Sequence, residues 1–400
     1  MHTLVLQGGA QALLLLFSML LAQRFDLVAF GDFIFGFQVG QVGASILALG
    51  ATFYLAKNFA AYSDIPEGMQ STFRLQNRFL ARGSLVLLAA WVLFAFIERK
   101  WVSTAAFGVS IANFAIVMMT AYFVAVGKAP LGNLLQAGRS LVLCMGVLLS
   151  LGVITNAHPG SVVLIAACSY TLVVYLLAGC RYSFGVRKGE STDQYEFARQ
   201  HIYFVVMTGI DILILKLMAL PNDVAIYGVA LFLSNAASFA LYAINANFTA
   251  RISRSVRSES RGESQKLLRS VAKLNALLSL PFLLVLIVFA MNLTLFYGED
   301  FENSKFVFLI LLAGQVINVF VGSVALVANV SGYESYISKF IFQSLLLKVF
   351  VGAAASYLYG ASGMAIAASL SNALWNTRSF VFVLNNIGLN TTILRFQRIG

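Results

Sequence analysis

Apolar runs of about twenty residues alternate with short polar stretches from residue 3 to residue 384. A transmembrane α-helix needs about 20 mostly apolar residues, so runs of this length can cross a bilayer. The pattern predicts an all-α polytopic membrane protein with about twelve spans and no large soluble domain. We expect spans at residues 3–23, 32–56, 83–97, 102–126, 134–156, 160–180, 200–220, 224–247, 271–296, 305–330, 335–358 and 361–384.

Composition supports this interpretation. Hydrophobic residues make up 60% of the chain and charged residues only 11%, whereas a soluble globular protein has about 25% charged residues. The net charge of +11 would suggest a nucleic-acid partner in a soluble protein. In a membrane protein, lysine and arginine collect in cytoplasmic loops, so we expect no nucleic-acid partner here.

The distribution of these charges predicts the orientation. With the N-terminus in the cytoplasm and alternating spans, most of the 27 lysines and arginines fall on the cytoplasmic side. This bias predicts an even number of spans with both termini cytoplasmic. The long basic segment 248–270 is expected to form an amphipathic helix on the cytoplasmic surface, held by anionic membrane lipids. The outer side receives only Arg24, Arg99, Lys100 and Lys305, and two lysines, Lys216 and Lys348, lie within spans.

Two halves of the chain share a short pattern. AFGDFIF (29–35) opens the second predicted span and IYGVALF (226–232) opens the eighth, each with an aromatic–glycine pair. Each is followed by a long apolar run and a basic stretch. This repeat predicts two pseudo-symmetric six-helix lobes, residues 1–190 and 191–400. Transporters built from such repeats bind substrate near the middle of the membrane and alternate its access to the two sides.

Four stretches carry a resemblance to a known family: LLLLFSMLLAQRFDLVAFGDFIF (13–35), GIDILILKLMALPNDVAIYGVALFL (209–233), LFYGEDFENSKFVFLILLAGQVIN (295–318) and VALVANVSGYE (324–334). In order and spacing they resemble the Wzx-type polysaccharide transporters, the O-antigen flippases of the MATE-like MOP superfamily. The resemblance implies a MATE-like fold. It also implies a flippase that moves an undecaprenyl-diphosphate-linked oligosaccharide, an O-antigen or other surface polysaccharide unit, across the bacterial inner membrane. The implied partners are this lipid-linked oligosaccharide, membrane lipids and other assembly proteins such as a polymerase.

Ionisable residues inside the spans are the candidate substrate-binding residues, because each costs roughly 2.5–3.5 kcal/mol at a helix centre. Lys348 lies in the middle of SLLLKVFVGAAAS (344–356) and must face a partner or a wet cavity. Asp211, midway through the seventh predicted span, is its candidate partner, and the pair would serve as a structural contact, a proton relay or both. Lys216 either snorkels to the outer surface or lines a cavity.

Arg24 ends the first predicted span, where the family carries an arginine. It is either an interface anchor or a cavity cation, with Asp26 and Asp32 as candidate partners. Lysine and arginine in a cavity would replace the lost hydration of a diphosphate. The polar residues within spans would meet sugar hydroxyls or form interhelical hydrogen bonds; these are Asn113, Gln315, Asn318 and Asn329.

Other function classes are less favoured. The sequence has no enzyme constellation and no Walker-type motif, so we expect no enzyme activity, cofactor or metal, with H+ or Na+ as candidate coupling ions. A MATE-like drug antiporter is the alternative. Such an antiporter should carry carboxylates in the first span and prolines that bend its helices. The first predicted span has no carboxylate, and the five prolines are expected at or near span ends. An integral glycosyltransferase or polymerase should have a large outer loop, and the predicted outer loops are short.

Overall fold

The computed structural model describes residues 2–62, 66–125, 129–152, 159–179, 193–257 and 261–394, and the regular elements in these ranges are helices. The chain forms two compact units, Met1–Val205 and Val206–Gly400. The predicted lobe boundary, between residues 190 and 191, lies outside the described residues, so that division stays a prediction. The all-α class is confirmed for the described part of the chain.

The first unit contains the long helices α1 (His2–Ala22), α2 (Leu27–Tyr62), α3 (Pro66–Glu98), α4 (Trp101–Ala125), α5 (Ala129–Gly152) and α6 (Pro159–Gly179). Helix α7 (Asp193–Met218) crosses the unit boundary. The second unit continues with α8 (Pro221–Ala237), α9 (Phe239–Arg257), α10 (Arg261–Met291), α11 (Thr294–Tyr297), η1 (Glu299–Phe301), α12 (Ser304–Val321), α13 (Val324–Val330), α14 (Glu334–Phe382) and η2 (Val383–Ile387).

Prolines mark several helix starts. Pro66, Pro159 and Pro221 are the first residues of α3, α6 and α8, and Pro130 is the second residue of α5. Proline suits the first turn because its missing N–H would have no intrahelical partner there. The prediction that all five prolines lie near span ends is wrong for Pro281, which lies inside α10.

Small residues set the packing of the first unit. Helices α2 and α4 approach so closely that a Cβ on Gly36 would overlap the backbone carbonyl of Ser103. The hydroxyl of Ser110 donates to the backbone oxygen of Phe37 at 2.7 Å. Small residues allow such approach between membrane helices, where van der Waals packing drives association. This contact lies next to the aromatic–glycine pattern that opens the second predicted span.

Three predicted elements differ from the observed helices. The third begins at Pro66 rather than residue 83, because the polar residues before its apolar part continue the same helix. The predicted span 224–247 is divided into α8 and α9 at Ser238, and the predicted span 305–330 is divided into α12 and α13 at Gly322, whose φ is +72°. Hydrophobicity is continuous across both breaks, so it does not reveal them.

The basic segment 248–270 also differs from its prediction. Its described residues form the last turns of α9 and the first turns of α10, and the three residues between these helices lie outside the described part of the chain. The segment therefore extends two long helices instead of forming a separate surface helix. Arg251, on α9, lies 5.5 Å from the ring centroid of Phe248.

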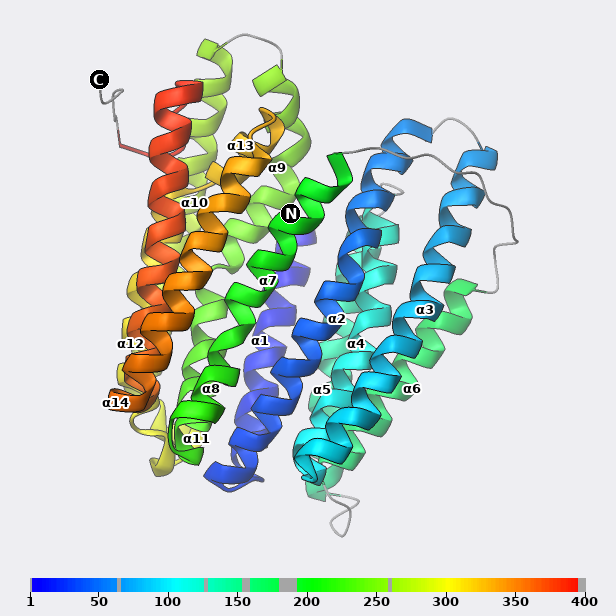
Figure 1. Cartoon of the computed structure of the whole chain (residues 1–400), viewed down its shortest axis with the longest axis vertical. Coiled ribbons are helices and arrows are strands. Elements are labelled where there is room, and N and C mark those ends of the chain that lie inside the picture. Colours follow the sequence, from blue (N-terminus) through cyan, green and yellow to red (C-terminus); the bar gives the residue numbers. More distant parts are fainter. Residues whose placement is uncertain are drawn as a thin grey trace. The chain divides into compact units, whose positions relative to one another are not determined.

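Helix α14 contains two predicted spans that reverse direction at Gly360. This residue has φ +56° and ψ −135°, a conformation that favours glycine. The two lengths run side by side, orange and red in Figure 1, and the hydroxyl of Ser371 donates to the backbone oxygen of Ser344 at 2.7 Å. The predicted pair of spans 335–358 and 361–384 therefore forms a tight antiparallel helical hairpin.

Among the described residues, six helical segments are long and apolar enough to cross a membrane, and three shorter apolar helices accompany them. These lengths and compositions are those of a multi-pass membrane protein. The count of twelve spans and the cytoplasmic position of both termini stay predictions. The six segments are Leu27–Ala48, Trp101–Thr120, Arg199–Met218, Arg261–Met291, Glu299–Val321 and Glu334–Ile387.

Candidate functional site

A buried ion pair joins α7 and α14 in the second unit. The Nζ atom of Lys348 lies 2.7 Å from Oδ1 of Asp211, and their side chains are only 7% and 3% exposed. The same Nζ donates to the backbone oxygen of Met207 at 2.7 Å. Met207 precedes Asp211 by one helical turn, so both acceptors lie on one face of α7. The predicted pairing of Lys348 with Asp211 is confirmed.

A tyrosine completes this site. The hydroxyl of Tyr227, a fully buried residue of α8, donates to Oδ2 of Asp211. Each carboxylate oxygen of Asp211 therefore has a donor, one from α14 and one from α8. Tyr227 is the aromatic residue of the IYGVALF pattern. The sequence analysis used that pattern as evidence for a repeat and did not predict that Tyr227 contacts Asp211. A buried tyrosine hydroxyl needs a hydrogen-bond partner, and that signal would have pointed to an acceptor.

The energetics of the pair constrain its role. Removing two charges from water costs several kcal/mol for each ion, and removing one partner of a buried pair costs about 3–5 kcal/mol. Both charges have hydrogen-bond partners: Lys348 donates to Asp211 and to the backbone oxygen of Met207, and Asp211 also accepts from Tyr227. The arrangement holds three helices of the second unit together. A proton delivered to Asp211 would remove the charge that Lys348 faces.

The other two predicted site residues are Arg24 and Lys216. Arg24 is exposed in the turn that follows α1, in the first unit. Lys216 is half-buried in the last turn of α7, five residues after Asp211. Five residues correspond to about 140° around a helix, given 3.6 residues per turn. Among the described contacts between the four predicted residues is the ion pair of Asp211 and Lys348.

Asp26 and Asp32, the two candidate partners of Arg24, each have a described contact. Oδ1 of Asp26 accepts the backbone N–H of Ala29 at 2.7 Å, which caps the start of α2. Both carboxylate oxygens of Asp32 accept from Nζ of Lys100, at 3.0 and 2.8 Å. The Asp32–Lys100 pair was not predicted, because Lys100 is distant in sequence.

Polar residues within the helices are bonded to one another. In the first unit, Arg139 donates to Oδ1 of Asn113, and the amide nitrogen of Asn113 donates to Gln41. Arg139 lies within α5, ten residues after the first residue of that helix, Ala129. In the second unit, the hydroxyl of Ser238 donates to Oε1 of Gln315 at 2.5 Å. Interhelical hydrogen bonding is therefore the observed role of Asn113 and Gln315.

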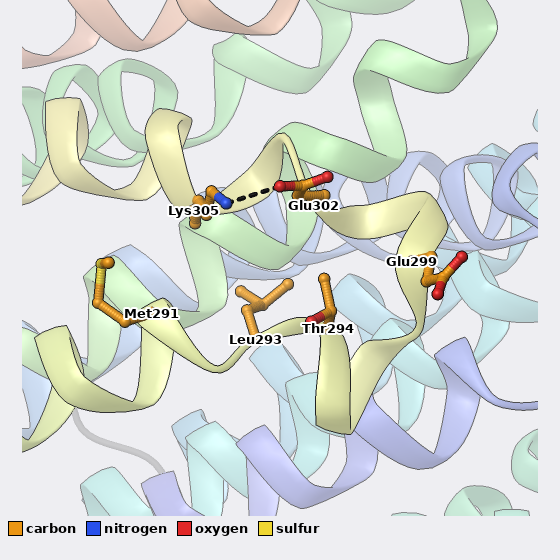
Figure 2. Close-up of a pocket in the computed structure, with 6 residues that line it drawn as sticks. All are labelled: Met291, Leu293, Thr294, Glu299, Glu302 and Lys305. Atoms are coloured by element: carbon orange, nitrogen blue, oxygen red, sulfur yellow. Dashed lines mark hydrogen bonds and ion pairs between the residues drawn. The ribbon is translucent and has the colours of Figure 1, made fainter.

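A small cavity of about 280 Å³ lies on the connection between α10 and α12. Figure 2 shows its mixed lining, with a hydrogen-bonded pair in which Nζ of Lys305 lies 2.7 Å from Oε1 of Glu302. Both of these side chains are exposed to solvent at 40% or more. None of the four predicted site residues lines this cavity, which is formed by Met291, Leu293, Thr294, Glu299, Glu302 and Lys305.

Comparison with solved structures identifies the fold. The MATE multidrug transporter DinF-BH aligns with a TM-score of 0.64 and 13% identity, over 98% of this chain and 95% of that chain. An inward-facing multidrug resistance MATE family transporter of the MOP superfamily aligns at 0.60 and 16%, over 95% and 93%. The lipid II flippase MurJ in an inward closed conformation aligns at 0.54 and 14%, over 93% and 87%.

The chain has the fold of MOP-superfamily transporters. These identities are low, so the similarity establishes the fold alone. No protein-family profile and no curated protein matches the sequence. The predicted superfamily fold is confirmed, and membership of its Wzx branch stays a prediction.

Proposed function

We propose that this protein is a membrane transporter that flips an undecaprenyl-diphosphate-linked oligosaccharide across the bacterial inner membrane by alternating access. The observation that carries the proposal is the fold, which is shared almost end to end with the lipid II flippase MurJ. The four family-like stretches, which point to a surface polysaccharide unit as cargo, support it. MATE transporters share the same fold, so the fold favours transport and the sequence favours the cargo.

The Asp211–Lys348 pair is the proposed site of ion coupling, with H+ as the simplest ion. An ionisable pair inside apolar helices is expensive and is a functional candidate by default. It bridges α7 and α14, and Tyr227 connects it to α8. Protonation of Asp211 would weaken the attraction between these helices and so bias the second unit towards another arrangement.

The second candidate function is a MATE-like antiporter for cations or drugs. The similarity to DinF-BH and the position of Pro281 inside α10 favour it. The first helix carries no carboxylate, which disfavours it. The sequence offered two arguments against an antiporter, the missing carboxylate and the prolines at span ends. Only the missing carboxylate remains, because Pro281 lies inside a helix.

A host that depends on this protein for surface polysaccharide tests the proposal. Deletion should leave lipid-linked oligosaccharide on the cytoplasmic face, where an impermeant glycosidase added to inside-out vesicles cleaves it. Complementation with the intact chain should restore its outward orientation. Unchanged orientation after deletion would reject the flippase. Proton-driven dye uptake by the purified protein in vesicles without any glycan lipid would support the antiporter instead.

A further inference from the structure

The exposed face of the first half of α14 changes character near its start. Lys339 is exposed, and the exposed residues that follow it at helical spacing are apolar, with Phe350 71% exposed. Intervals of three and four residues place them on one face of the helix. These apolar residues are Phe342, Leu346 and Phe350. The opposite face is buried, so this stripe is the outer surface of the second unit.

The second half of α14 shows the same change in reverse order. Ile366 and Leu370 are exposed apolar residues, and Arg378, two helical turns after Leu370, is exposed. Because the helix reverses at Gly360, the end that carries Arg378 lies beside the start that carries Lys339. Nη1 of Arg378 donates to Oε1 of Gln343, which follows Lys339 by one turn.

Helix α10 shows a similar change along its own exposed face. Its exposed residues run from Lys266 and Lys273 to Leu277, which is 70% exposed, and end at Met291. From Leu277 to Met291 the helix rises about 21 Å at 1.5 Å per residue. This length fits within a hydrocarbon core of about 30 Å. The change from lysine to leucine therefore corresponds to the boundary between headgroups and acyl chains, and α14 shows the equivalent change between Lys339 and Phe342.

We propose that Lys339, Gln343 and Arg378 form a binding site for the phosphate of an anionic phospholipid headgroup. The guanidinium group can bind phosphate oxygens in pairs, and the amide of Gln343 fixes its position. Within the described part of the chain, neither Lys339 nor Arg378 forms an ion pair, so their charges are available to a ligand. The acyl chains would lie on Phe342 and Leu346. This site is independent of the proposed transport cargo.

Native mass spectrometry of the purified full chain tests the site, with phosphatidylglycerol and phosphatidylcholine of identical acyl chains as the probes. We expect preferential binding of phosphatidylglycerol. Each basic residue near an anionic membrane surface contributes about 1 kcal/mol, or about five-fold in affinity. The double variant K339Q/R378Q should therefore lose roughly 25-fold of this preference. An intact chain without the preference, or a double variant that keeps it, would overturn the proposal.

Two further variants separate site binding from general effects. K339R/R378K retains both charges and should retain most of the preference, whereas its complete loss would contradict a charge-based site. K305Q removes an exposed lysine that is paired with Glu302 at the connection between α10 and α12. It should leave the preference unchanged, and an equal loss in K305Q would assign the effect to net charge and overturn the site.

Discussion

Oδ1 of Asp223, in the first turn of α8, accepts the backbone N–H of Ala361 at 2.8 Å, directly after the reversal of α14. Its other oxygen accepts the backbone N–H of Leu220 at 3.2 Å. One carboxylate therefore caps α8 and anchors the turn of the α14 hairpin. A Cβ on Gly360 would overlap this carboxylate, so the turn requires glycine for both its backbone conformation and its space.

The first prediction concerns this turn. Gly360→Ala should lower the free energy of unfolding by about 1–3 kcal/mol, the usual cost of a strained backbone residue. Gly360→Ala combined with Asp223→Ala should be less destabilising than the sum of the two single changes, because the overlap is removed. Thermal unfolding of the purified protein measures both. Gly262→Ala, where an added Cβ meets no atom within 4 Å, is the matched control and should not destabilise.

The second prediction tests the packing of α2 on α4. Gly36→Ala should destabilise the first unit by about 1–3 kcal/mol, the typical cost of overpacking, because the added methyl group meets the backbone of Ser103. Backbone cannot rotate away as a side chain can. Gly9→Ala in α1, where nothing lies within 4 Å, should be neutral or slightly stabilising. Equal melting temperatures for the two variants would contradict this account of the contact.

The sequence predicted helices and one pairing, and missed what depends on three-dimensional proximity. Lys348 and Asp211 could be paired because few other charges lie in the apolar runs. Tyr227 was missed because its ring suits an apolar helix and its hydroxyl is invisible in the hydrophobic pattern. The break at Gly322 depends on a backbone angle, about which hydrophobicity carries no information. The reversal at Gly360, by contrast, falls between the predicted spans 335–358 and 361–384.

Charged partners near the helix ends were equally hard to predict. Asp32 forms an ion pair with Lys100, directly before the start of α4, that the sequence did not predict, while its candidate pairing with Arg24 stays a prediction. The fold brings the start of α2 and the start of α4 together, and neither run contains a signal for that contact.

The third prediction concerns Tyr227. Tyr227→Phe removes the hydroxyl that donates to Asp211 and preserves the ring in its buried position. A hydrogen bond to a charged group contributes about 1.5–3 kcal/mol, so the variant should be destabilised by about that amount. Chemical or thermal unfolding checks the value. Tyr357→Phe is the comparison, at a position where the side chain is 75% exposed, and a loss in Tyr227→Phe no larger than in Tyr357→Phe would argue against the bond to Asp211.

The fourth prediction separates structure from coupling at the Asp211–Lys348 pair. Lys348→Met leaves Asp211 buried without its cation, and should destabilise the protein by about 3–5 kcal/mol. Lys348→Met combined with Asp211→Asn removes both charges and should recover most of that loss, because replacing a whole buried pair is often neutral. Loss of transport in the single variant would therefore not distinguish misfolding from a functional defect, and the folded double variant is the informative protein.

If the pair couples transport to protons, the double variant should be folded and inserted but should no longer respond to a pH gradient. In vesicles, the rate of glycan-lipid flipping by the intact chain should rise with an imposed gradient, whereas the rate in the double variant should be the same with and without it. Lys305→Gln is the control, since it removes an exposed lysine that belongs neither to the pair nor to the predicted site, and it should keep the response to the gradient. A double variant that remains gradient-dependent would assign the pair a purely structural role, because a site that binds the coupling proton cannot be replaced by uncharged residues without loss of coupling.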